Sequence, residues 1–354
     1  MMKTKEIGSE FWDAEISGAF STNRKTYLSG RTALAAIISD LKSRGARRVC
    51  LPDYCCESMI EPFLRQGMQI CFYPVQQNET SLTFSLEKVE NCDAVLLVNY
   101  FGFMDSETKA SMRKCREAGK SVILDLTHAV FFDDEEYCAD YIFGSYRKWT
   151  GVEAGFSSGK RQPQLESWRL NETGSKYLML RQEARQIKYE FVTGGYSDED
   201  MRRKQLSLFE KAEELLDKEY LSDTDEKNKA RIRSLDTDYI RDKRRNNAKT
   251  LYAFSSQLKL CRLMFSALSD NVIPLTVPIL VTEGRRDSLR TFLRERGVFC
   301  PVHWPLTSLH KAEKGALELY REELSLICDQ RYDVSDMARM MEMVKKWEMT
   351  TSVR

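Results

Sequence analysis

Short apolar runs alternate with amphipathic stretches through the first half of the chain. The apolar runs are rich in Val, Ile, Leu, Phe and Tyr, and several end at Pro, Gly or Asp, which is typical of buried strands. They cover residues 47–52, 69–75, 93–102, 121–131 and 140–145. Between them, apolar positions at helical spacing predict helices over residues 31–45, 57–67 and 106–120. This alternation predicts an α/β fold with right-handed crossovers and a mainly parallel sheet buried by helices.

The pattern changes to long, charged helices between about residue 165 and residue 260. Two stretches, 201–221 and 237–258, are amphipathic, and we expect their charged runs to be solvated faces or a subunit contact. Further along, the pattern predicts a strand, a helix, a strand and a closing helix over 277–282, 284–297, 298–306 and 334–347. We therefore predict a large domain over residues 1–235 and a small C-terminal α/β domain over residues 236–354.

Composition and charge restrict the class of protein. The 354 residues carry 54 Lys and Arg against 53 Asp and Glu, so the net charge of +1 gives no reason to expect a nucleic-acid partner. No apolar run is long enough to span a membrane, and the polar start "MMKTKEIGSEFWD" does not resemble a signal peptide, so we expect a cytoplasmic protein without a membrane partner. The 10 cysteines include no C-x-x-C pair, and with 3 histidines they predict buried thiols and no metal site.

Three stretches of the predicted large domain end in polar residues that we expect to meet at one edge of the sheet. In the first, "YLSGRTAL", Ser29 and Gly30 precede a helix that starts near Arg31 or Thr32. Exposed backbone amides and the positive end of the helix suit a phosphate group there. The alternative is an ordinary helix cap provided by Ser29.

The other two stretches carry an aspartate and a lysine. In "VILDLTHA", an apolar strand delivers Asp125 to its end, and His128 follows three residues later. A buried carboxylate is costly without a cationic partner, which is either a structural arginine or the protonated ring nitrogen of a ligand. In "DYIFGSYRKWTGVEAGF", Lys148 stands where a strand gives way to a glycine-rich loop. A lysine at such a point is ordinarily a solvated loop cation.

The order of these stretches resembles that in fold-type I enzymes that use pyridoxal 5′-phosphate (PLP), and more narrowly the DegT-like (DnrJ/StrS-type) sugar aminotransferases. The blocks "SGRTAL", "LDLTH" and "GSYRKWTGVEAG" stand where that family has "SGTAAL", "EDxAQ/H" and "SF…K…GEGG". "VNYFG" and "GVFCPVHWPL" are similar to its "VHLYG" and "GI…HYPxPLH", so the resemblance covers residues from about 27 to 345. It implies a large domain on a mainly parallel, seven-stranded-type sheet, with a small C-terminal α/β domain.

The resemblance also implies roles for single residues. Lys148 would form the internal Schiff base with the cofactor aldehyde and then shuttle protons. Asp125 would pair with the pyridinium nitrogen and keep it protonated. His128 would contact the phenolic oxygen of the cofactor, or would act as a supporting histidine behind the site.

Further residues are implied in binding. Ser145 would bind the cofactor phosphate together with the turn formed by Ser29, Gly30, Arg31 and Thr32. Either Tyr54 or a neighbouring cysteine, Cys55 or Cys56, would stack on the cofactor ring, and Asn99 would hydrogen-bond in the site. The residues implied in substrate contact are Arg147, His303 and Trp304, with plain aromatic packing as the alternative for the last two.

The implied activity is transfer of an amino group from an amino-acid donor, by analogy glutamate, to a keto or aldehyde acceptor, with a nucleotide-linked keto sugar as one candidate. The partners would be these small molecules and a second copy of the chain in a homodimer. An "NYR"-type block is missing between residues 165 and 235, and the loop after the lysine is shortened, which weakens the inference to a nucleotide-linked sugar. A PLP-dependent dehydratase or lyase, or a non-catalytic relative that binds PLP, would carry the same lysine and aspartate.

Overall fold

The computed structural model describes residues 5–12, 17–103, 106–132, 138–163, 168–193 and 199–351. The chain divides into two compact units. The first unit comprises Met1–Lys5, Glu10–Ala46 and Leu124–Thr237, and the second comprises Glu6–Ser9, Arg47–Ile123 and Asp238–Arg354. The division into domains 1–235 and 236–354 stays a prediction. No helix in the described ranges is long and apolar enough to cross a membrane.

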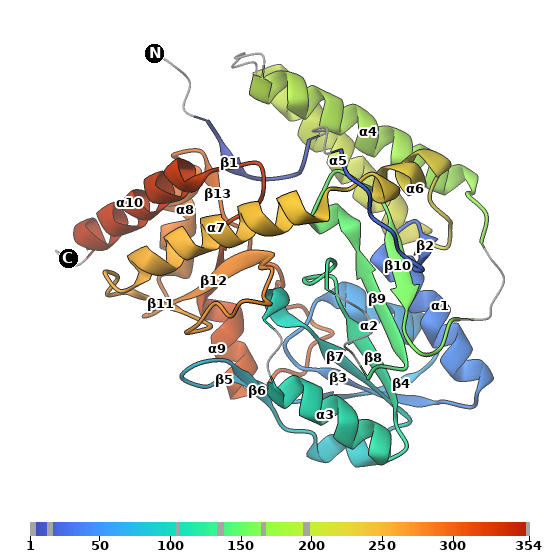
Figure 1. Cartoon of the computed structure of the whole chain (residues 1–354). Helices are drawn as coiled ribbons and strands as arrows, with labels where there is room; N and C mark the ends of the chain where they lie inside the picture. Colours follow the sequence, from blue (N-terminus) through green and yellow to red (C-terminus); the bar gives the residue numbers. More distant parts are fainter. Residues whose placement is uncertain are drawn as a thin grey trace. The chain divides into compact units, whose positions relative to one another are not determined.

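The main sheet has seven strands in the order β2-β10-β9-β8-β7-β3-β4 (Figure 1). In chain order these strands are β2 (Lys25–Tyr27), β3 (Arg48–Pro52), β4 (Gln69–Tyr73), β7 (Ala94–Val98), β8 (Ser121–Asp125), β9 (Tyr141–Ser145) and β10 (Gly155–Ser158). In the second unit, β3 pairs in parallel with β4 and β7. In the first unit, β10 pairs antiparallel with β2 and β9. The predicted α/β fold with a large, mainly parallel sheet is confirmed.

The apolar runs of the first half located the buried strands, although the predicted strands 93–102 and 121–131 end earlier, at Val98 and Asp125. All five predicted strands are present as β3, β4, β7, β8 and β9, and the three predicted helices are α1 (Gly30–Ser43), α2 (Glu57–Arg65) and α3 (Ser106–Glu117). The pattern did not reveal β2 and β10, which contain 3 and 4 residues. Strands this short carry too few positions for an alternation to be recognised.

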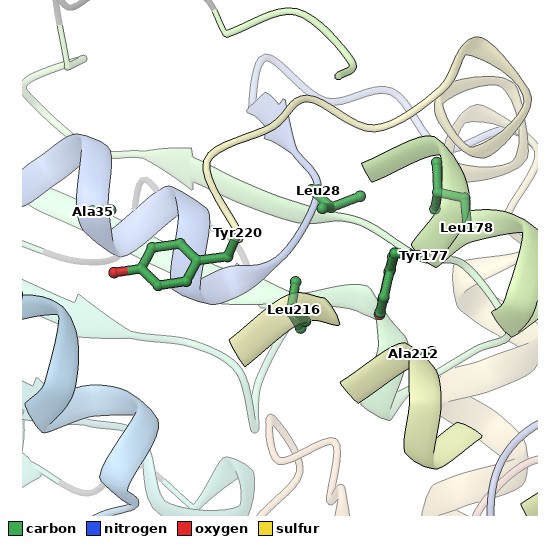
Figure 2. Packing of buried hydrophobic residues seen from close by; sticks show 7 residues of the cluster. All are labelled: Leu28, Ala35, Tyr177, Leu178, Ala212, Leu216 and Tyr220. Carbon is green, nitrogen blue, oxygen red and sulfur yellow. The ribbon is translucent and has the colours of Figure 1, made fainter. Parts of the chain in front are cut away.

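The long charged helices predicted after residue 165 are present. In the first unit they are α4 (Glu172–Thr193), α5 (Glu199–Lys218) and α6 (Glu226–Arg233). Figure 1 shows α4 and α5 running alongside each other. They cover the start of α1 through a buried cluster, which Figure 2 shows from close by. The cluster contains Leu28, Ala35, Tyr177, Leu178, Ala212, Leu216 and Tyr220. Because Leu28 directly precedes the turn at Ser29, this packing fixes where the turn lies.

The second unit contains a smaller antiparallel sheet with the order β11-β12-β14. Its strands are β11 (Cys261–Leu263), β12 (Thr276–Val281) and β14 (Glu323–Ile327), and the helices in this part of the chain are α7 (Thr237–Ser255), α8 (Arg286–Arg294), α9 (Lys314–Glu322) and α10 (Val334–Thr351). Two further pairs join β1 (Ile7–Gly8) to β13 (Val298–Phe299) and β5 (Val75–Gln77) to β6 (Leu82–Phe84).

The predicted strand over residues 298–306 is wrong beyond Phe299. Pro301 and Pro305 interrupt this segment. Proline has no backbone N–H to donate to a neighbouring strand, so the segment cannot continue the pairing that β13 begins.

The expectation of a solvated charged face is wrong at Arg244 of α7, whose side chain is buried. Its guanidinium donates to Gln330 Oε1 at 2.9 Å and to the carbonyl oxygens of Pro274 and Leu275 at 3.2 and 2.7 Å. Burial lowers the pKa of this guanidinium. These hydrogen bonds make the buried cation tolerable, and they give Arg244 a structural role inside the second unit.

A buried ionic network ties α4 to the loop before β10 in the first unit. Glu153 is 1% exposed, and its carboxylate accepts hydrogen bonds from Arg181 Nε at 2.7 Å, from Tyr177 Oη at 2.7 Å and from Arg185. Burial alone would raise the pKa of Glu153, but Arg181, Arg185 and Arg147 lower it to about 2. The carboxylate is therefore charged in the folded protein at neutral pH.

Replacing this carboxylate is expected to destabilise the protein strongly. The Glu153→Gln variant should lose about 3–5 kcal/mol of unfolding free energy in urea at pH 7, because two buried arginines lose the counter-charge that they share. The matched control is Glu183→Gln on α4, whose exposed carboxylate pairs with Lys204, and it should lose less than about 1 kcal/mol. Since the folded-state pKa of Glu153 lies below the unfolded value, its contribution should disappear as the pH falls toward 2. Equal losses in the two variants would contradict this account.

Candidate functional site

The turn at the start of α1 lies against the end of β9 in the first unit. A Cβ atom placed on Gly30 would lie 3.3 Å from the Cβ of Ser145 and 3.3 Å from the carbonyl oxygen of Gly144. From the neighbouring strand, a Cβ on Gly155 would lie 2.1 Å from both the carbonyl carbon and the carbonyl oxygen of Ser29. A side chain at position 155 would therefore displace the turn. The structure thus brings the predicted phosphate turn and Ser145 together.

The turn itself combines a helix cap with open amides. Ser29 is the N-cap of α1, and its Oγ accepts a hydrogen bond from the Thr32 amide at 3.2 Å. The Ser29 carbonyl accepts from the Ala33 amide at 3.1 Å. Within the described part of the chain, the amides of Gly30 and Arg31 donate to no other residue. Two N–H groups at the positive end of a 14-residue helix are thus available to an anion.

The side chains of this turn serve the protein's own packing. Arg31 forms an ion pair with Asp217 at 2.6 Å, and its guanidinium lies 5.6 Å from the ring centroid of Tyr220. The Thr32 hydroxyl donates to the Tyr220 carbonyl at 2.5 Å. These contacts hold the start of α1 against the segment that follows α5. What Arg31 offers to a ligand at the turn is its backbone amide.

The predicted aspartate, histidine and lysine also lie within the first unit. Lys148 Nζ is 3.2 Å from His128 Nε2. Asp125 is 2% exposed, and its Oδ1 accepts a hydrogen bond from the Thr127 amide at 2.6 Å. Trp149 Nε1 donates to the Thr127 carbonyl at 2.8 Å, so the residue after the lysine holds the segment after the aspartate.

The Asp125 carboxyl group has a raised pKa. Burial raises the pKa of its carboxyl group, and the Thr127 hydrogen bonds and the Lys148 charge only partly oppose this. Lys148 is the cation whose charge acts on this carboxyl group. A buried carboxylate in this setting would be stabilised by a positively charged group of a ligand.

The Arg147 side chain contacts helices α4 and α5. Its guanidinium binds the Glu213 carboxylate on α5 and donates to Tyr177 Oη on α4 at 3.2 Å. It thereby joins the network around Glu153. Its predicted contact with a substrate stays a prediction.

The remaining predicted residues lie in the second unit. They are Tyr54, Cys55 with its alternative Cys56, Asn99, His303 and Trp304. The ring of Tyr54 stacks on Tyr100 with centroids 5.7 Å apart, and it meets the edge of Trp304 at 4.7 Å. Tyr54, Asn99 and Trp304 are each 1% exposed. The structure therefore brings Tyr54 and Trp304 together in an aromatic cluster, and the binding roles of all these residues stay predictions.

Sequence reasoning missed the supporting residues of the site. Thr127 fixes the Asp125 carboxylate through its amide, and Glu213 balances the charge of Arg147. The first has a local signal, because an aspartate side chain commonly accepts from the amide two residues later. The Glu213 contact has no local sequence signal, because residues 147 and 213 meet only through the packing of α5.

Comparison with known proteins supports the fold. PseC from Helicobacter pylori, described as an aminotransferase involved in the biosynthesis of pseudoaminic acid, matches over 93% of this chain and 87% of its own, with 15% identity and a TM-score of 0.62. The putative sugar aminotransferase Spr1654 from Streptococcus pneumoniae, in its PMP-form, matches over 99% of this chain and 100% of its own, with 12% identity and a TM-score of 0.63. TlmJ from Streptoalloteichus hindustanus, an aminotransferase, matches over 93% and 86%, with 16% identity and a TM-score of 0.60.

This chain has the fold of these aminotransferases. The predicted fold is thereby confirmed over nearly the whole chain. No protein-family model matches the sequence, and no curated protein does.

The close approach at Gly155 can be tested directly. The Gly155→Ala variant is expected to lose about 1–3 kcal/mol of unfolding free energy, because its Cβ overlaps the Ser29 carbonyl group. Gly30→Ala is the matched comparison, and its loss should be smaller because its tightest contacts are 3.3 Å. Urea unfolding of both variants measures the difference. A loss at position 155 no larger than that at position 30 would show that the turn yields easily.

Proposed function

We propose that this protein is a PLP-dependent aminotransferase. The observation that carries the proposal is the arrangement of Lys148 beside His128, with the buried Asp125 and the open amides of the α1 turn in the same compact unit. The fold shared with PseC and with Spr1654, whose structures include a PLP-form and a PMP-form, supports it. The substrates would be an amino-acid donor, such as glutamate, and a keto or aldehyde acceptor, with a keto sugar as the favoured class.

The residues present fit the parts of PLP. The amides of Gly30 and Arg31, with the partly buried Ser145 next to them, suit the phosphate group. The Asp125 carboxylate suits a ring nitrogen that carries a proton, because a cationic partner would offset the cost of its burial. Lys148 supplies the primary amine that must hold the cofactor covalently.

When bound, PLP supplies an aldehyde that combines with primary amines and a ring that accepts electrons from the substrate carbon. The chain's own residues do the rest. Asp125 would hold the proton on the ring nitrogen, and the buried strand end keeps water from the carboxylate. Lys148 Nζ, the group that would hold the cofactor, would also remove a proton from the substrate carbon and return it. His128 Nε2, at 3.2 Å, would orient that amine.

We further propose that the enzyme acts in the cytoplasm as a homodimer. The homodimer rests on the resemblance to the DegT-like family. The near balance of 54 basic and 53 acidic residues agrees with small-molecule partners rather than nucleic acid.

The lysine is tested by borohydride reduction of the protein loaded with PLP. The wild-type chain should incorporate the cofactor irreversibly on the peptide that contains Lys148, and Lys148→Ala should incorporate none. The matched control is Lys160→Ala, an exposed lysine of the same unit, which should be labelled like the wild type. Labelling of another lysine in the wild-type protein would overturn the assignment.

The aspartate and the reaction type are tested in the half-reaction with glutamate. Asp125→Asn should still bind PLP but should form 2-oxoglutarate at least about 100-fold more slowly, because an amide cannot hold the ring nitrogen protonated. The wild-type protein should release no ammonia during this reaction. Release of ammonia in proportion to the substrate consumed would instead assign the protein to the eliminating enzymes.

A further inference from the structure

Three cysteines of the second unit meet although they are far apart in the sequence. Cys71 Sγ lies 2.7 Å from Cys50 Sγ and 3.1 Å from Cys92 Sγ. Cys50 and Cys71 are direct partners in the register of β3 and β4, and Cys92 ends the 3-10 turn Glu87–Asn91 that precedes β7. All three sulfur atoms lie within 4.8 Å of one another, and none belongs to a disulfide.

The surrounding residues hold the three sulfur-bearing segments in place. The Asp93 carboxylate accepts hydrogen bonds from the amides of Arg47 and Arg48 at 2.8 and 2.9 Å, which fixes the start of β7 to the start of β3. The Arg48 guanidinium donates to Gln69 Oε1 on β4 at 2.9 and 3.1 Å and to the Asn91 carbonyl at 3.4 Å. Arg48 on β3 therefore connects all three segments. The positions of the three sulfur atoms are thus fixed by contacts that do not involve the cysteines.

The composition of the cluster indicates which ion it suits. Among the described residues, no histidine, aspartate or glutamate joins the three cysteines at this distance. Soft sulfur ligands select Cu(I) or zinc, and structural zinc sites almost always take four ligands. A set of three sulfur atoms therefore favours a monovalent ion in trigonal coordination. Cys71 is partly exposed whereas Cys50 and Cys92 are buried, which gives an ion a path of entry.

We propose that Cys50, Cys71 and Cys92 form a three-coordinate site for Cu(I). Binding of one ion by three thiols releases three protons and leaves two net negative charges, which the adjacent Arg48 guanidinium partly balances. At metal–sulfur distances of about 2.3 Å, three coplanar sulfur atoms lie about 4 Å apart. Each sulfur thus needs to move outward by about an ångström or less. The bound ion would link β3, β4 and the segment before β7.

The test uses the reduced full-length protein, titrated anaerobically with Cu(I) against a chromophoric Cu(I) chelator. We expect one copper per chain, three sulfur neighbours at about 2.3 Å by X-ray absorption, and an affinity at least about 100-fold lower in Cys71→Ser, since even outer-shell changes cost 10–100-fold. The matched control is Cys115→Ser, because Cys115 is a buried thiol of α3 outside the cluster, and it should keep the wild-type affinity. Cys92→Ser, outside the strands, should also lose copper and covers the case in which Cys71→Ser fails to fold.

Three results would overturn the proposal. The first is copper binding that is unchanged in both Cys71→Ser and Cys92→Ser variants with native circular dichroism. The second is Zn(II) binding tighter than Cu(I) binding at these cysteines. The third is a Cys50–Cys71 disulfide in protein purified without reductant, found by mass spectrometry as a loss of two hydrogens, together with no copper uptake after reduction. Each readout is independent of aminotransferase activity.

Discussion

The candidate site depends on how closely the first turn of α1 approaches the ends of β9 and β10. Gly155 makes this approach possible, because any side chain there would overlap the Ser29 carbonyl group. The buried cluster that includes Leu28 and Ala35 holds the helix from its other side, against α4 and α5. As a result, two amides donate to no residue in the described ranges. Their position is set by backbone packing, and any attraction for an anion would come from the helix end rather than from a dedicated cationic side chain.

Two consecutive cationic residues, Arg147 and Lys148, contact different kinds of partner in this unit. The arginine is balanced by Glu213 and lies within reach of the buried Glu153 network. The lysine amine contacts the His128 imidazole instead. Because Glu213 and the Glu153 network balance Arg147, the positive charge of this arginine is neutralised by its contacts with α4 and α5. The same carboxylates thus fasten two helices to the unit and balance the charge of the residue that precedes the candidate reactive amine.

The sequence predicted what depends on local pattern. Buried parallel strands have continuous apolar runs, so β3, β4, β7, β8 and β9 were predicted from the sequence. The same criterion wrongly predicted a strand after Phe299, where prolines interrupt an apolar segment. The resemblance carried by the phosphate turn, Asp125 and Lys148 was enough to predict the fold and to nominate the site. Features created by contacts between distant segments could not be predicted from the sequence. The burial of Arg244 and the meeting of Cys50 with Cys71 depend on helix packing and strand register, which no short motif encodes.

A binding turn made from main-chain groups leaves its side chains free to diverge. At position 31 the arginine side chain is paired with Asp217. A different side chain there would change what surrounds the helix start without removing either amide. Position 155 is different, because a side chain there would overlap the Ser29 carbonyl group and shift the whole turn. The turn can therefore accept a change of charge at its surface more easily than a single added carbon atom in the strand behind it.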